Sequence, residues 1–541
     1  MNPEMIASID DLGAARRYHS ASRWVEACER YAAADRVSPL SVEDREDWAE
    51  AAQIGGRISE AVEQLARCFE EHVATGAIHE ATRATYWLWS AHAFARAEFA
   101  IGAGWVERAR EAAGGEEYGW LLIPQAYRHF GRCDWQTAEG ILHRAAELGM
   151  GRGDVDLVTI ATTMRGRATL KLGFLERGVA LLDEAMARIL TRSTSVRATS
   201  AMYCAAIGSC YEAHEVGRAA EWSIALDGWL STFPSLSGVY YGNCRIYRAM
   251  LLRLRGDWTR SEEELENTCA SLASDAQLII GHAWYELGDV RRLQGKANAA
   301  EAYERAVTSG HSGQPGLALL RWREGDLAAA ESGIRRALAE QTQIDERLAI
   351  LPAAAKIAIA CGEFEVAESC VGEIESALAT YPTPALRATA HLIRGCLQLA
   401  QGSATKALPR LRAASDTWRE LGAPYEAAAA GLHLAEARRS VGDEEGAALE
   451  LRACLATFEH LGARPDADRA RELSGEVDHA LSPRETQVLR LIVDGHTNAE
   501  IAANLHLSER TVHRHVSNIL TKLGLPSRTA AAIHAVRRGL V

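Results

Sequence analysis

A short pattern recurs along most of the chain and restricts it to a stack of helical hairpins. A turn residue, usually Gly, is followed five positions later by a small residue that opens an apolar helix. The clearest copies are Gly56 with Ala61, Gly295 with Ala300, Gly325 with Ala330, Gly362 with Ala367, Gly402 with Ala407 and Gly442 with Ala447. Weaker copies are Gly104 with Ala109, Cys133 with Ala138, Gly173 with Gly178, His214 with Ala219 and Gly256 with Ser261. From Cys133 to Gly442 the mean interval is about 39 residues, a length typical of structural repeats.

Each part of this pattern has a physical reason. Gly ends the first helix because it adopts left-handed φ without the clash of a Cβ atom. The small residue lets the second helix approach the first closely, and the apolar face of each hairpin is buried only by the next hairpin. Aromatic residues make up only 6% of the chain, which favours close-packed helices over sheets. We therefore predict an all-α chain, with a helical-hairpin solenoid over residues 1–461.

The repeats resemble the tetratricopeptide repeat family, whose usual period is about 34 residues. The likeness covers most of residues 40–460, but these units are longer and irregular and lack the full consensus. A solenoid of this kind has a concave surface that binds a partner or a ligand in many proteins.

Three aromatic clusters interrupt the alanine-rich repeats, and they have two possible roles. The clusters are Tyr86, Trp87, Trp89 and Phe94, then Tyr240, Tyr241, Arg245 and Tyr247, then Trp284 and Tyr285. Lining a groove, they would hold a small molecule or a peptide. Alternatively, aromatic side chains at helical spacing form the core between repeats.

The chain has no motif of catalysis or cofactor binding. It contains no G-x-x-x-x-G-K-[ST] loop, no G-x-S-x-G elbow and no G-x-G-x-x-G after a strand pattern. His79-Glu80 would begin a zinc-binding H-E-x-x-H, but Arg83 stands where the second His is needed. We expect no catalytic residue, no metal and no cofactor.

The remaining composition predicts a cytoplasmic protein. No stretch of 18 or more apolar residues occurs, and the start, MNPEMIASIDDLG, lacks a basic region followed by an apolar one, so we expect no membrane contact. The eleven Cys residues are scattered without a C-x-x-C pair, and we predict that they are buried free thiols.

The charge divides the chain into two parts. Residues 462–480 are polar and lack apolar periodicity beyond Leu473, which predicts a linker. Residues 481–541 then carry eight Arg or Lys against four Asp or Glu, a net of +4, and this leaves −17 for residues 1–480. A basic segment on an acidic body indicates that the segment meets a polyanion.

Four short helices are expected in residues 481–541. Ser482-Pro483-Arg484-Glu485 and Thr497-Asn498-Ala499-Glu500 each form a capping box, and Ser508 and Ser527 cap the third and fourth helices. Two short helices, a tight turn and a longer third helix are the helix-turn-helix arrangement.

The third helix, expected over residues 509–523, combines an apolar stripe with a polar face. The stripe is Val512, Val516, Ile519, Leu520 and Leu523, while Arg510, His513, Arg514, Ser517 and Thr521 point away from it. Such a helix suits the major groove of DNA, whereas the alternative is an ordinary solvated face.

These motifs, from Leu481 to Leu540, are similar to the LuxR-type DNA-binding domain of bacterial transcription regulators. The matching residues are Arg484-Glu485, Asn498, Glu500-Ile501-Ala502, Thr511-Val512, His515, Asn518-Ile519, Lys522-Leu523-Gly524 and Ser527-Arg528. The resemblance implies that His513, Arg514 and Ser517 face bases and that Thr497, Asn498, Thr511, Asn518 and Lys522 hold the phosphate backbone. We add Arg510 to the backbone contacts. The resemblance also implies that Glu485 acts within the fold and that the fourth helix forms a dimer contact.

One position departs from the family pattern. Lys usually follows Thr-Val in this family, and here the residue is His513, which at an ordinary pKa of about 6.5 is mostly neutral at pH 7. His513 either reads a base by hydrogen bonding or contributes less to affinity.

The body is similar to the helical-repeat segment of LuxR-type activators of the maltose-regulator class, without their nucleotide-binding module. We therefore predict a one-component regulator that binds double-stranded operator DNA as a homodimer and acts with RNA polymerase. Its body would sense a small molecule, a peptide or a protein. The alternative is a repeat scaffold for protein partners, with DNA binding only for localisation.

Overall fold

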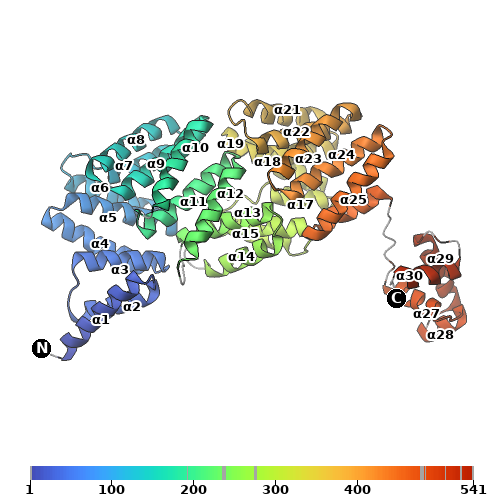
Figure 1. The fold of residues 1–541 in the computed structure, drawn as a ribbon, viewed down its shortest axis with the longest axis horizontal. Helices are drawn as coiled ribbons and strands as arrows, with labels where there is room; N and C mark the ends of the chain where they lie inside the picture. Colours follow the sequence, from blue (N-terminus) through green and yellow to red (C-terminus); the bar gives the residue numbers. More distant parts are fainter. Residues whose placement is uncertain are drawn as a thin grey trace.

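The chain is an all-α superhelix followed by a small helical domain (Figure 1). The computed structural model describes the chain except residues 1–2, 192, 234–238, 273–276, 476–480, 482, 506, 524, 526 and 539–541. Within the described residues there is no β-strand, as predicted.

The helices of the first half of the superhelix are α1 (Pro3–Ser20), α2 (Trp24–Val37), α3 (Val42–Ile54), α4 (Ile58–Thr75), α5 (Ile78–Ser90), the π-helical η1 (Ala91–Ala95), α6 (Phe99–Ala112), α7 (Gly119–Phe130), α8 (Trp135–Arg152), α9 (Val155–Lys171), α10 (Leu175–Leu190), α11 (Val196–Glu212), α12 (Val216–Leu230), α13 (Val239–Leu254) and α14 (Trp258–Ser271). The second half contains α15 (Gln277–Gln294), α16 (Ala299–Thr308), α17 (Gly316–Arg323), α18 (Leu327–Glu340), α19 (Ile344–Leu348), α20 (Leu351–Cys361), α21 (Phe364–Ala377), α22 (Pro384–Ala400), α23 (Ala404–Glu420), α24 (Pro424–Ser440), α25 (Glu444–Leu461) and α26 (Arg464–Ser474). The small domain is α27 (Pro483–Val493), α28 (Asn498–Leu505), α29 (Glu509–Lys522) and α30 (Arg528–Arg538).

The predicted turn-and-small-residue pattern produces the hairpins. Positive φ occurs at Gly325, Gly362, Gly402 and Gly442, and also at Cys133 and His214, which stand where other repeats have Gly. The small residues five positions after these turns, which are Ala330, Ala367, Ala407, Ala447, Ala138 and Ala219, are all 0% exposed. At these six positions the small residue is therefore fully enclosed by its neighbours.

In two copies of the predicted pattern, the structure places the turn or the buried small residue at a different position from the one predicted. Gly104 lies inside α6, and the turn before that helix is at Ala97, whose φ is +56°. Gly295 does end α15, but α16 begins only at Ala299, so the fully buried small residue is Ala302 instead of Ala300. In both places the turn and the helix start are separated differently from the other repeats.

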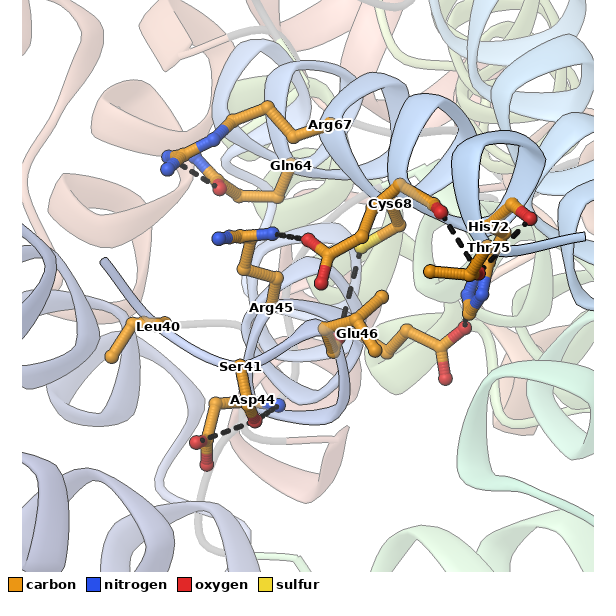
Figure 2. Close-up of polar contacts among 12 residues, drawn as sticks. Leu40, Ser41, Asp44, Arg45, Glu46, Gln64, Arg67, Cys68, His72 and Thr75 are labelled. Atoms are coloured by element: carbon orange, nitrogen blue, oxygen red, sulfur yellow. Dashed lines mark hydrogen bonds and ion pairs between the residues drawn. The ribbon is translucent and has the colours of Figure 1, made fainter. Parts of the chain in front are cut away.

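Ion pairs join the helices of the hairpins where their apolar faces end. Figure 2 shows such a contact between α3 and α4, where His72 Nε2 lies 2.9 Å from Glu46 Oε1. In the same view Ser41 caps α3 by accepting from the Asp44 N–H at 3.2 Å. Glu46 also accepts from Arg83 of α5 at 2.8 Å. Burial opposes the charge on Glu46, but His72 and Arg83 outweigh it and lower its pKa to about 2.

The superhelix brings its last helices against its middle. Arg323 of α17 donates to both oxygens of Asp466 in α26, at 2.8 and 2.9 Å, across 143 residues of sequence. One apolar cluster joins residues of α13–α16 with residues of α24–α26, including Trp258, Leu287, Leu451 and Phe458. A common space is consequently surrounded by six helices, which are α17, α20, α22, α24, α25 and α26.

The prediction of an irregular linker from residue 462 is wrong for Arg464–Ser474. These residues form α26, which buries Ala467 and Ala470 against the preceding helices and ends at Gly475 with φ of +70°. The inner face of this short run consists of Ala467 and Ala470 with Leu473 as its one large apolar residue, so it shows no repeating pattern of large hydrophobic side chains. Residues 476–480, the rest of the expected linker, lie outside the described residues.

The prediction of eleven free thiols is also wrong for one pair. Cys204 of α11 and Cys244 of α13 form a disulfide with their Cα atoms 5.2 Å apart. The two positions are 40 residues apart, about one repeat, so the stacking of neighbouring hairpins places them together. The other nine Cys are free, and most of them are buried.

We predict that Gly178 of α10 cannot be replaced by Ala without loss of stability. A Cβ atom there would lie 2.6 Å from Leu170 Cγ in α9, so Gly178→Ala should destabilise the protein by about 1–3 kcal/mol. Gly140 of α8 has no atom within 4 Å of its ideal Cβ position, and Gly140→Ala should stabilise by about 0.5–1 kcal/mol. Urea and thermal unfolding measure both. An equal effect of the two substitutions would contradict the close helix crossing.

Candidate nucleic-acid interface

The four C-terminal helices form a domain with its own core. Val488, Leu489, Ile501, Val512 and Ile519 are buried together with Ala531 and Ala535 of α30. Arg484 of α27 donates to the Leu505 carbonyl at the end of α28, at 2.6 Å, and so joins the first two helices. This packing holds α28 and α29 in a fixed relation, which is what a helix-turn-helix requires.

The predicted helix caps are present where the structure describes them. Thr497 and Glu500 form a reciprocal capping box: the Glu500 N–H donates to Thr497 Oγ1 at 3.3 Å, and the Thr497 N–H donates to Glu500 Oε2 at 2.7 Å. These hydrogen bonds from Thr497 lower the pKa of Glu500. Ser508 accepts from the Thr511 N–H at 3.1 Å, and Ser527 accepts from the Ala530 N–H at 3.2 Å. Ser482 lies outside the described residues.

The polar face of α29 is open to solvent, and its apolar stripe is not. Val512 and Ile519 are 0% exposed, and Val516, Leu520 and Leu523 pack against them. The exposed side chains of the helix include Arg510, His513, Arg514, Ser517 and Asn518. The side chains of Thr521 and Lys522 lie outside the described residues. The helix thus offers two guanidinium groups, an imidazole, an amide and a hydroxyl on one surface.

Two threonines expected at the DNA backbone already make side-chain contacts within the domain. The hydroxyl of Thr497 donates to Glu500 Oε2 at 2.9 Å, so both hydrogen-bond donors of Thr497 serve the cap. The Thr511 hydroxyl lies 2.7 Å from that of Ser508. Their side chains therefore fix the starts of α28 and α29.

Arg528 holds the start of α28, a role that the sequence alone did not assign. Its guanidinium donates to Asn498 Oδ1 at 2.6 Å and also to the carbonyl oxygen of His496. The Asn498 side-chain oxygen is therefore used within the domain. The place of Arg528 directly after the Ser527 cap was the one signal in the sequence. Glu485 is 3% exposed, consistent with a role within the fold.

The first aromatic cluster does not line a groove. Tyr86, Trp87 and Trp89 are 3%, 1% and 9% exposed. The ring centroid of Tyr86 lies 5.1 Å from that of Trp120 in α7, and the ring centroid of Trp89 lies 5.1 Å from that of Tyr127 in the same helix. Of the two roles that the sequence left open for these three residues, the core between neighbouring hairpins is the one that their burial supports.

The other two clusters are also parts of helix packing where they are described. Arg245 pairs with Glu264 of α14, and burial raises the pKa of Tyr247 to about 12. The Arg305 guanidinium lies 4.6 Å from the ring centroid of Trp284. The side chains of Tyr240 and Tyr241 lie outside the described residues.

Residues 479–535 match the family described as bacterial regulatory proteins, luxR family. The C-terminal domain is a LuxR-type helix-turn-helix. This match agrees with the geometry above, in which α28 and α29 lie on a common core and the polar face of α29 is exposed.

Curated relatives share this domain. The transcriptional regulatory protein DegU of Brevibacillus brevis is 44% identical over 63 residues, which are 12% of this chain and 27% of DegU. The response regulator protein VraR of Staphylococcus aureus is 44% identical over 66 residues, 12% of this chain and 32% of VraR. The chain thus spans less than a third of the length of these relatives. The homology supports DNA-binding transcription regulation through the C-terminal domain.

Solved structures resemble the superhelix at a low level. One of them is the crystal structure of the APC/C hetero-tetramer Cut9-Hcn1. The match covers 87% of this chain and 96% of the matched chain, with 11% sequence identity and a TM-score of 0.36. Among the residues that the structure describes, no helix is long and apolar enough to cross a membrane, and no group of His, Cys, Asp and Glu is arranged to hold a metal ion.

We predict that Arg528→Ala lowers DNA affinity for every sequence alike and lowers the stability of the domain by about 1–3 kcal/mol, because it releases Asn498 and the start of α28. The control is Arg490→Ala, which removes an exposed Arg of α27 and the same charge. Thermal unfolding and DNA titration measure the two effects. Wild-type stability of the Arg528 variant would rule out the anchoring role.

Proposed function

We propose that the protein is a one-component transcription regulator that places α29 in the major groove of a specific double-stranded DNA site. The observation that carries this proposal is the exposure of Arg510, His513, Arg514, Ser517 and Asn518 over a buried apolar stripe. Polar side chains on a rigid helix read base edges by hydrogen bonds, and a basic domain gains affinity from the phosphates. The net charge of +4 on residues 481–541 fits this use.

Within that proposal, His513, Arg514 and Ser517 face the bases. Asn498, Asn518, Arg510 and Lys522 contact the phosphate backbone, together with the capped helix starts at Thr497 and Thr511. A helix start directs N–H groups and a partial positive charge outward, which suits a phosphate oxygen.

We predict different consequences for the two kinds of contact. Arg514→Ala should cost roughly 1–3 kcal/mol of binding free energy and relax the preference at one base position, because a bidentate contact to guanine is lost. Lys522→Ala should weaken binding to all sequences alike and reduce the salt dependence.

The test begins by selecting the preferred site from random double-stranded DNA with the full-length protein. Competition binding against every single-base variant of that site then separates the two effects. A uniform loss of affinity for Arg514→Ala would contradict the proposed orientation of α29. Failure of the protein to select any site would reject sequence-specific binding.

We further propose that the regulator binds as a homodimer through α30. Ile533 and Val536 are 50% and 63% exposed, and their spacing of three residues places them on one face of this helix. A single domain of this size makes few base contacts, so two copies on an inverted repeat give the specificity that a genome demands.

We predict that Val536→Glu abolishes dimeric binding to the selected site, because it places two like charges in the proposed contact. The control is Leu449→Glu on α25, since Leu449 is exposed to a similar degree, 64%. Sedimentation of the protein–DNA complex gives the number of chains per site. One wild-type chain per specific site would exclude the dimer.

The superhelix serves, in this proposal, as the sensing part and not as an enzyme, and the regulator acts on RNA polymerase in the cytoplasm. Support comes from its position: α26 packs into the superhelix and is followed, after residues 476–480, by the DNA-binding domain. A scaffold for protein partners remains the alternative function, and identification of the molecules that co-purify with the full-length chain separates the two.

A further inference from the structure

A cavity of about 530 Å³ lies among the helices α17, α20, α22, α24, α25 and α26. Its apolar surface includes Trp322, Tyr425 and Phe458, and its charged surface includes Arg323, Lys356 and Arg469. This volume is in the range of sites that hold small organic ligands, which are typically about 300–1,000 Å³. The cavity contains none of the aromatic residues that the sequence pointed to.

The positive charges around this cavity are not all neutralised. Asp466 accepts from Arg323 and, at 3.0 Å, from the Tyr425 hydroxyl, while Arg469 pairs with Glu436 at 2.7 Å. Burial opposes the charge on Glu436, but hydrogen bonds from His433 and Arg469 outweigh it and lower its pKa to about 2. Each of these carboxylates is therefore already matched with an arginine.

Lys356 is the charge left over. Among the described residues, its ammonium has neither a hydrogen bond nor a carboxylate within 4.0 Å, and the Nη1 atom of Arg323 is buried without a partner. Burial lowers the pKa of Lys356 by more than Cys396 and Asp466 raise it, and the charges of Arg292 and Arg323 lower it further. The Glu426 carboxyl of α24 interacts with Lys356 at longer range, but burial raises the pKa of Glu426. An anion bound in the cavity would pair with both the Lys356 ammonium and the Nη1 atom of Arg323.

We propose that this cavity binds a small organic anion, in which a carboxylate, phosphate or sulfonate group is joined to an aromatic or branched apolar body. The anionic group meets Lys356 and Arg323, and the apolar body lies against Trp322, Tyr425 and Phe458. The role of this ligand as an effector of DNA binding rests on the proposed function. The existence of the anion-binding site does not.

The cavity borders α26, the last helix before the DNA-binding domain, and a bound ligand therefore contacts the helix that leads to that domain. Pro465, Asp466 and Arg469 of α26 form one wall, whereas Arg323 belongs to α17 and Lys356 to α20. A ligand that contacts all three helices favours one placement of α26, the last helix of the superhelix. The ligand then shifts the equilibrium between arrangements of the domain by its difference in affinity for them.

The test uses two fluorescent probes of the same aromatic frame and the full-length protein. One is 1-anilinonaphthalene-8-sulfonate, which is an anion, and the other is the uncharged N-phenyl-1-naphthylamine. Wild-type protein should bind the sulfonate at one site per chain, with a rise in melting temperature. Lys356→Met should weaken sulfonate binding at least tenfold and leave binding of the neutral probe within twofold.

Two controls separate a binding role of Lys356 from a structural one. Lys406→Met, an exposed Lys of α23, should bind both probes as wild type does. Lys356→Arg keeps the positive charge and should retain the preference for the sulfonate. Lys356→Met should melt at the wild-type temperature or above it, because the lost charge has no partner; a lower melting temperature would mark a structural residue and overturn the proposal.

Equal binding of the sulfonate by wild type and Lys356→Met would likewise overturn the anion site. Titration of the selected DNA site is the independent measurement. If the wild-type chain binds no DNA specifically while the probe results hold, the proposed function fails and the cavity remains an anion site. If DNA binding holds and the probes do not discriminate, the cavity proposal fails alone.

Discussion

The close crossing of two helices at a residue with almost no side chain is the contact on which the superhelix depends. Ala330, Ala367, Ala407 and Ala447 are fully buried at this crossing, and Gly178 takes the same place where Leu170 leaves no room for a Cβ atom. Because each hairpin buries its other face on the next, the geometry of one crossing is passed along the chain. The curvature that brings α26 beside α17 results from this repetition.

That curvature creates the polar environment of the second half. Arg323 and Asp466 are 143 residues apart, and Lys171 pairs with Asp345 across 174 residues. Such pairs lie where hairpins from different parts of the superhelix meet, so that burial is compensated by opposite charge. Lys356 departs from this rule, since it lines the cavity without a carboxylate partner. Its place on the cavity wall, beside the unpartnered Nη1 atom of Arg323, gives this exception its significance.

The DNA-binding domain depends on a different kind of constraint. Its helices are short, so caps and single side-chain anchors contribute much of their definition: the capping box at Thr497, the Ser508 cap and the Arg528 anchor all act at helix starts. These contacts serve the interface indirectly, because they orient α28 and α29 while leaving Arg514 and Ser517 on the open face. The caps and the anchor thus use side chains other than Arg514 and Ser517.

Local chemistry could be predicted from the sequence to a large extent. The hairpin turns, the buried small residues, the caps at Thr497, Ser508 and Ser527 and the apolar stripe of α29 all follow from interactions within a few residues. For the same reason the helix-turn-helix was visible from its spacing and composition alone. The register errors at Gly104 and Gly295 arose where an irregular repeat changed the distance between a turn and the next helix.

Contacts between distant repeats were decided only by the tertiary structure. Helical spacing cannot distinguish a ring that fills the space between hairpins from one that lines a groove, so the sequence left both roles open for Tyr86, Trp87 and Trp89, and only their burial decided for the core. The small inner face of α26 gave no signal as a helix, and Cys204 meets Cys244 because one repeat stacks on the next. The cavity likewise joins residues from six helices. Its existence depends on the accumulated rotation of the repeats, a property that no single segment encodes.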